Sequence, residues 1–410
     1  MAQINDLLTN ISNIKSDIKN AIENKGQNIT NFDSYANAIL NIKSNGTIME
    51  VDGNSAIVQN NTLILNPNNK VIIPDGTRLA YGSFEYVPDN YDLSQVHNGN
   101  NMFAYCPNLI SIDNIDTSNM NSTHAMFDNC FNLQNVSNIN LHNSITTRSL
   151  FYNCVNLTNI CSLDLASSTT MTYMFYNCLN LQTIITLENL DNVVSTHEAF
   201  MYCENLRYLS NSILNMPNCI NAHSMFDNCF NFTTSPEMIL PNAVDIGAMF
   251  WNDHKLTNVG NITTSNKLQL INKMFVECHS LKNVPLFETS GVINTHSMFD
   301  NCWNITTVPN FNFSNVTNMQ STFYNAYNLV DVPQFYAPNL TSINKAFYNC
   351  NKLSNESIQN IINICLNSNI PSNQKNLRTG NGCSPFNTTN ITNSKYSNRL
   401  TELASAGWTY

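Results

Sequence analysis

The stretch AMFDNCFNL at residues 125–133 decides the fold, because close copies of it recur along most of the chain. TMTYMFYNCLNL stands at 170–181 and NVTNMQSTFYNAYNL at 315–329. The Phe of this motif, called the marker Phe below, recurs every 24 to 26 residues. Such regular spacing indicates stacked structural repeats. The marker residues are Phe103, Phe127, Phe151, Phe175, Phe200, Phe226, Phe250, Phe275, Phe299, Phe323 and Phe347.

Other residues keep fixed positions relative to the marker Phe. The third residue after it is Cys in nine of the eleven units, and the sixth is always apolar. We interpret the Met-Phe-x-x-Cys segment as one or two helical turns with an inward apolar side. The Leu-x-x-Val segment that follows reads as a short strand of a parallel sheet. A period of this length predicts a leucine-rich-repeat array.

A single unit cannot fold alone. Burying five or six apolar side chains stabilises it by roughly 1.5–3 kcal/mol each, whereas ordering the backbone costs on the order of 1–2 kcal/mol per residue. Stacked units also bury their faces on one another. We therefore predict an α/β repeat solenoid of about eleven 24-residue turns. Its parallel β-sheet would lie on one face and its short helices on the other.

The flanking segments divide the chain into four parts. Residues 74–353 form the solenoid, with an entering turn at 74–98, and residues 354–410 read as a C-terminal helical cap. Residues 26–73 hold short β-like runs that suit either a linker or a small β module. Residues 1–25 read as an N-terminal helix.

The N-terminal helix carries apolar residues at alternating steps of three and four, which is a heptad seam. Ile at both seam positions favours three strands, so we expect a trimeric coiled coil or an attachment helix. The alternative is an ordinary amphipathic helix docked on the body. The seam residues are Ile4, Leu7, Ile11, Ile14 and Ile18.

Composition and motifs exclude several function classes. The net charge is −10, which argues against nucleic acid as a partner. No run of eighteen apolar residues predicts a membrane span, and the N-terminus does not read as a secretory signal. Without a phosphate loop, a nucleophile elbow or a His-Glu-x-x-His motif, we expect no enzyme activity, cofactor or metal. The Cys column reads as buried structure, since Cys-x-x-Cys pairs are absent.

The residue eight after the marker Phe should point outward from the strand. These small hydrogen-bonding groups suit carbohydrate or a polar protein surface; alternatively, they are ordinary solvent-facing residues. Arg207 and Tyr208 are the richest local cluster, since both types are common interface anchors. The row comprises Ser111, Asn135, Asn159, Thr183, Tyr208, Thr234, Asn258, Asn283, Thr307 and Asp331. Aromatic residues close after the marker form a second candidate strip: Tyr105, Tyr152, Tyr176, Tyr202, Trp251, Trp303, Tyr324 and Tyr348.

The three stretches quoted at the start resemble the BspA-like leucine-rich-repeat surface-protein family over about residues 90–353. That resemblance implies a solenoid used for adhesion to host or partner surfaces. Members of the family normally carry export signals and surface anchors, which we do not recognise here.

Residues 17–39 look like segments of bacteriophage tail or baseplate proteins, and the closing LTELASAGWTY is similar to the ends of repeat proteins of gut phages and their hosts. This resemblance implies a virion component that binds a host-surface glycan or protein through the solenoid. Its N-terminus would join other virion proteins as a trimer. The alternatives are a bacterial cell-surface adhesin of the BspA-like type and a structural decoration of the virion.

Overall fold

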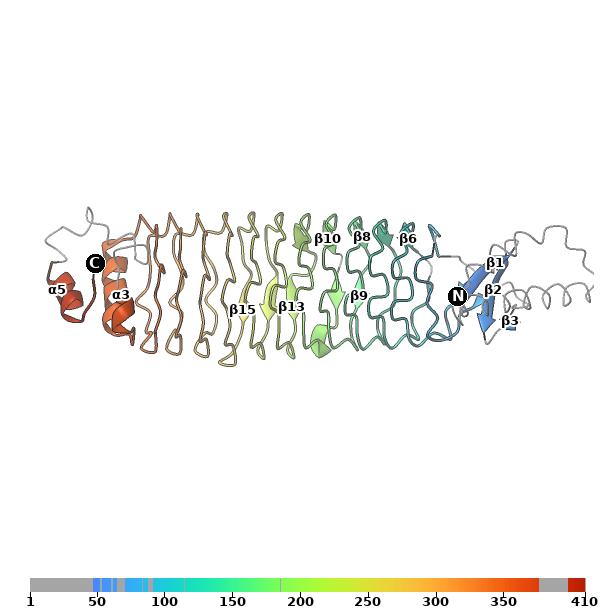
Figure 1. Cartoon of the computed structure of the whole chain (residues 1–410), viewed down its shortest axis with the longest axis horizontal. Coiled ribbons are helices and arrows are strands. Elements are labelled where there is room, and N and C mark those ends of the chain that lie inside the picture. Colours follow the sequence, from blue (N-terminus) through green and yellow to red (C-terminus); the bar gives the residue numbers. More distant parts are fainter. Residues whose placement is uncertain are drawn as a thin grey trace, which may run out of the picture.

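The computed structural model describes residues 47–51, 54–59, 62–64, 71–82, 84–87, 91–113, 115–184, 186–375 and 397–409. Within them the repeats wind into one elongated solenoid of stacked coils (Figure 1). The predicted seam of Ile4, Leu7, Ile11, Ile14 and Ile18 lies outside the described residues. In the described part, no helix combines the length and apolar character needed to cross a bilayer.

Neighbouring coils pair in parallel along three rows. The first row lies eight and nine residues after the marker Phe, and the second row lies about twelve residues after it. The third row consists of single bridges five residues before the marker Phe, from Asn98↔Ser122 to Asn318↔Ser342. Figure 1 shows the first two rows along different sides of the coils. The predicted parallel pairing is confirmed, but it is spread around the coil instead of forming one sheet. Row one contains β6 (Ser111–Ile112), β7 (Asn135–Val136), β8 (Asn159–Ile160), β10 (Thr183–Ile184) and β12 (Tyr208–Leu209); row two contains β9 (Leu163–Asp164), β11 (Leu187–Glu188), β13 (Ile213–Asn215), β14 (Glu237–Ile239) and β15 (Ile262–Thr263).

The marker Phe residues form a continuous stacked column through the core. All eleven side chains are completely buried. Successive ring centroids lie 5.2 to 5.7 Å apart, with interplanar angles of 3° to 18°. Offset stacking of this kind adds about 0.5–1.5 kcal/mol per pair to the gain from burial. The inward placement of the marker Phe is therefore confirmed.

The predicted helices around the marker Phe are wrong. Successive backbone N–H groups alternate between two kinds of partner: Met102 donates to Gly99 O of its own coil at 3.1 Å, whereas Phe103 donates to Met126 O of the next coil at 2.9 Å. An α-helix instead sends every N–H four residues back along its own chain. The segment is a chain of tight turns that is hydrogen-bonded to the neighbouring coils.

Two residues in every coil adopt left-handed backbone angles to make these turns. They lie two before and two after the marker Phe, as at Ala125 (φ 52°) and Asn129 (φ 58°). Asn tolerates this region better than most residues, and it fills the second position in eight of the eleven coils. Its amides also join coil to coil, since Asn153 Nδ2 donates to Asn129 Oδ1 and Asn177 Nδ2 donates to Asn153 Oδ1, both at 2.9 Å. These Asn residues therefore have a structural role in the turns.

The Cys column lies in the core, as predicted. Each of its thiols donates to a main-chain carbonyl of the preceding coil, usually that of the marker Phe; Cys154 Sγ, for example, lies 3.1 Å from Phe127 O. Burial raises the pKa of Cys178 and its neighbours well above the ordinary value. Asp253 and Ala326 replace Cys at this position and are also buried.

The ends of the array differ from its coils. On the N-terminal side, β1 (Thr47–Val51), β2 (Asn54–Gln59) and β3 (Thr62–Ile64) form an antiparallel sheet, and β4 (Val71–Ile72) pairs in parallel with β5 (Tyr91–Asp92). At the other end, α3 (Asn355–Leu366) lies against the last coil, where Ser357 Oγ donates to Val330 O at 2.8 Å (Figure 1). The remaining elements are η1 (Leu190–Asn192), η2 (Ser372–Gln374) and α5 (Ser397–Ser405).

Candidate binding surface

The row eight residues after the marker Phe faces outward for most of its length. Tyr208 is 49% exposed, whereas the next residue, Leu209, is only 6% exposed. Ser111 departs from the expectation, because it is 7% exposed and its hydroxyl donates to Asp113 at 2.5 Å. Thr183 lies in β10. Asn135 is half-buried, and the exposed members are Asn159, Tyr208, Thr234, Asn258, Asn283, Thr307 and Asp331.

Part of this polar row bonds to itself. Asn159 Nδ2, for example, donates to Asn135 Oδ1 of the preceding coil at 2.8 Å. Such contacts satisfy groups that a ligand would otherwise use. The stretches with unsatisfied polar groups are therefore the better candidates for binding.

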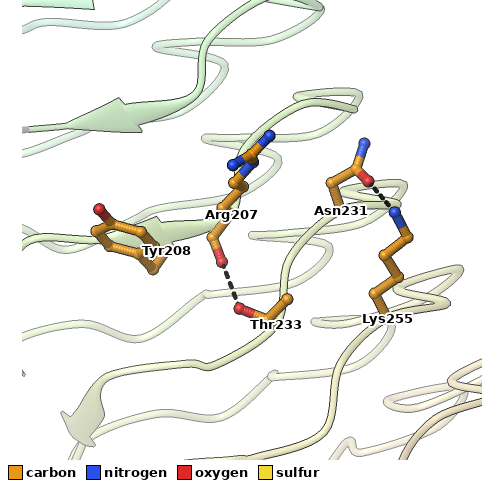
Figure 2. Close-up of a pocket in the computed structure, with 5 residues that line it drawn as sticks. All are labelled: Arg207, Tyr208, Asn231, Thr233 and Lys255. Carbon is orange, nitrogen blue, oxygen red and sulfur yellow. Dashed lines mark hydrogen bonds between the residues drawn. The ribbon is translucent and has the colours of Figure 1, made fainter.

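Arg207 and Tyr208, singled out from the sequence, line a shallow pocket of about 320 Å³ (Figure 2). Three consecutive coils contribute to it, because Asn231 and Thr233 follow Phe226 and Lys255 follows Phe250. Thr233 Oγ1 donates to Arg207 O at 3.2 Å, which fixes one wall. Lys255 Nζ donates to Asn231 Oδ1 at 2.6 Å, which fixes the other. Figure 2 shows the two cationic groups on either side of Asn231.

The pocket is positively charged in a chain of net charge −10. Its lining contains no carboxylate, and none of the ion pairs in the described part of the chain involves Arg207 or Lys255. A guanidinium offers a rigid fork of donors to a carboxylate, sulfate or phosphate, and a lysine adds a point charge. The exposed Tyr208 ring supplies an amphipathic wall. This arrangement suits an anionic or polyhydroxylated group.

The other members of the predicted row lie on separate coils along the axis and do not converge. Sequence reasoning found Arg207 and Tyr208 but missed Asn231, Thr233 and Lys255. These three residues were missed because only the position eight after the marker Phe was compared, whereas they stand five or seven residues after it. Comparing those columns across coils would have shown that Lys255 replaces an Asn.

The second candidate strip packs largely on itself. Tyr152 stacks on Tyr176 with 4.7 Å between centroids, and Tyr324 stacks on Tyr348 at 5.0 Å. Trp303 does not belong to this strip, because it stands four residues after Phe299. Most of these rings therefore support neighbouring coils.

Residues 80–187, 148–261 and 244–361 match the family described as "Mycoplasma protein of unknown function, DUF285". No functionally curated protein matches the chain. Solved structures with leucine-rich repeats are similar at low identity. A leucine-rich cell-surface protein of Faecalibacterium prausnitzii is 15% identical, with a TM-score of 0.30, covering 78% of this chain and 98% of its own. A leucine-rich repeat protein of Eubacterium ventriosum is 16% identical, with a TM-score of 0.33, covering 73% and 87%. An internalin of Listeria monocytogenes is 15% identical, with a TM-score of 0.28, covering 65% and 74%.

Proposed function

This chain belongs to the DUF285 family of repeat proteins, and on that premise we propose that it is a non-enzymatic recognition protein of a bacterial cell surface. It binds an anionic glycan or an acidic protein surface through the pocket of Arg207, Tyr208 and Lys255. The observation that carries the proposal is the pair of cations, Arg207 and Lys255, that lines the pocket without a carboxylate beside it.

We favour a bacterial cell-surface adhesin over a virion component. The family is described from Mycoplasma, a bacterium, which supports a bacterial adhesin. The virion interpretation depends mainly on residues 1–39, which lie outside the described residues. Trimerisation through that segment and its attachment to other virion proteins remain predictions. Antibody labelling of intact bacteria and of any purified phage particles distinguishes the two locations.

The binding test uses substitutions that the other coils already carry. Arg207→Thr introduces the residue that the next two coils carry at the equivalent position, Thr233 and Thr257. Lys255→Asn introduces the residue that the preceding coil carries at the equivalent position, Asn231. The control is Lys352→Asn, because Lys352 Nζ makes the same 2.6 Å bond to an Asn, Asn328, outside the pocket.

The full chain is applied to immobilised heparin and to an array of sialylated, sulfated and neutral glycans. Each pocket variant is expected to weaken binding to the anionic members by roughly 10- to 100-fold, since charged hydrogen bonds contribute about 1.5–3 kcal/mol. Lys352→Asn should bind like the wild type. Equal losses in the control, or no binding of the wild type to any anionic member, would refute the proposal.

A further inference from the structure

Four side chains, each four residues after a marker Phe, stack in one column across consecutive coils. Phe230 and His254 have ring centroids 5.2 Å apart, His254 and His279 4.6 Å, and His279 and Trp303 3.6 Å. The interplanar angles are 10° to 12°. The two imidazoles thus lie between a phenyl and an indole ring.

A carboxylate completes a cluster beside the two imidazoles. Glu277 Oε2 lies 2.6 Å from His279 Nε2, and Glu277 Oε1 accepts a hydrogen bond from Asn301 Nδ2 at 3.1 Å. Glu277 occupies the left-handed position after the marker Phe, with φ 62°, where most coils carry Asn. Glu277 therefore stands at a left-handed backbone position where eight other coils carry Asn.

The three side chains offer donor atoms that all lie within 4.8 Å of one another. They are partly exposed, with 21% of the His279 side chain and 32% of the Glu277 side chain accessible, so an ion can reach them. Within the part of the chain that the structure describes, no other group of three such residues converges in this way.

We propose that His254, Glu277 and His279 form a binding site for a divalent transition-metal ion of the Zn²⁺ class. Imidazole nitrogen and carboxylate oxygen bind such ions at about 2.0–2.2 Å. Donors at that distance in a tetrahedron lie roughly 3.3 Å apart. Because the two imidazole planes are nearly parallel, one ring has to tilt out of the stack before both in-plane lone pairs reach the same ion. The ion would then replace the hydrogen bond between His279 and Glu277.

Asn301 is the positioning residue, because it holds the Glu277 oxygen that does not face His279; outer partners of this kind commonly set metal affinity. Three protein ligands also leave at least one coordination position open to a group from outside. The site is separate from the pocket of the proposed function. Lys255 follows His254 in sequence, but its amine bonds to Asn231 of the preceding coil.

Three variants remove one ligand each while keeping the local fold. His254→Phe and His279→Phe retain a stacking ring, and Phe230 already occupies the same position. Glu277→Asn introduces the residue that eight other coils carry at this left-handed position. Titration of the full chain with ZnCl₂ by isothermal calorimetry should show one saturable site, and each variant should weaken it at least about tenfold.

The control is His223→Asn, because His223 also contacts a histidine of the neighbouring coil, with 5.7 Å between centroids, but belongs to no three-ligand cluster. It should bind Zn²⁺ like the wild type. A fluorescence titration with CuCl₂ locates the ion independently, because Trp303 stacks on His279 and its emission should be quenched. Trp303→Phe should remove most of that quenching and leave the Zn²⁺ affinity unchanged.

Three results would overturn the proposal. The first is the absence of saturable Zn²⁺ binding by the wild-type chain. The second is unchanged affinity in the Glu277→Asn variant together with unchanged affinity in either histidine variant, which would leave the cluster as a stack of rings with an ordinary His–Glu pair. The third is copper quenching that persists in full in the Trp303→Phe variant, which would place the ion elsewhere.

Discussion

Asp253 is expected to make the stability of the solenoid depend on pH. It is completely buried in the Cys column, where Oδ1 accepts the N–H of Cys229 at 2.9 Å and Oδ2 has no hydrogen-bond partner. A cysteine here would donate to the carbonyl of the preceding marker, Phe226. Burial, with the nearby Asp227 carboxylate, raises the pKa of Asp253 well above its usual range, so the folded chain holds the proton of this carboxyl to higher pH than the unfolded chain does.

The sign and size of the effect follow from linkage. In the unfolded chain the carboxyl titrates near its ordinary pKa of about 3.9. Between that pH and the raised pKa of the folded state, the folded chain binds one more proton, and stability falls by about 1.4 kcal/mol per pH unit. Asp253→Asn removes this cost, and its amide can accept from Cys229 and donate where a thiol would.

The assay is urea unfolding of the wild type and of Asp253→Asn, followed by circular dichroism at pH 4.0, 5.5 and 7.0. The difference between the two proteins isolates this group from the other carboxylates. We expect little difference at pH 4.0 and a stabilisation of Asp253→Asn that grows towards pH 7.0, by up to about 1.4 kcal/mol per pH unit. An advantage that does not grow with pH, or a variant that is less stable at pH 7.0, would show that Asp253 is not a buried neutral acid.

Three further predictions concern the core and the turns. Phe226→Ala should cost about 3–5 kcal/mol in urea unfolding, and a negligible change would contradict the stacked Phe column. Asn177→Ala should cost about 1–2 kcal/mol, because it loses the bond to Asn153 and the tolerance of Asn for left-handed angles; Asn177→Gly, which keeps the backbone freedom, should cost less in the same assay. Burial raises the pKa of Asp227 to about 7, so Asp227→Asn should gain stability relative to the wild type as pH rises from 4 to 7 and no further above that; a gain that is equal at pH 4 and pH 7 would count against it.

The repeat spacing predicted the core well. A strict period places every marker Phe and every Cys of its column at one inward position, and those residues stack as expected. The same period could not distinguish a helix from a chain of tight turns, because Met, Phe and Cys at adjacent and third positions suit both. The distinguishing signal was Asn129 and its equivalents, since an Asn at a fixed position marks left-handed backbone.

The site was predicted in part, because it is formed by differences between coils and not by what they share. Arg207 and Tyr208 were visible as unusual residues within one unit. The expectation of no metal was based on short motifs, whereas the proposed metal site takes His254 and His279 from neighbouring coils, which no short motif joins. Which columns converge depends on how the turns fold, and the sequence period alone does not contain that information.

The alternating hydrogen bonds of the turns have a mechanical consequence. The bonds that Phe103, Phe127 and their equivalents make to the next coil run along the long axis of the molecule. Tension between the two ends would therefore load these bonds lengthwise and open the array from one end, one coil after another. Each opened coil would release about 24 residues of chain, or roughly 80 Å at full extension. A solenoid built in this way would yield gradually under load and could rewind when the load falls.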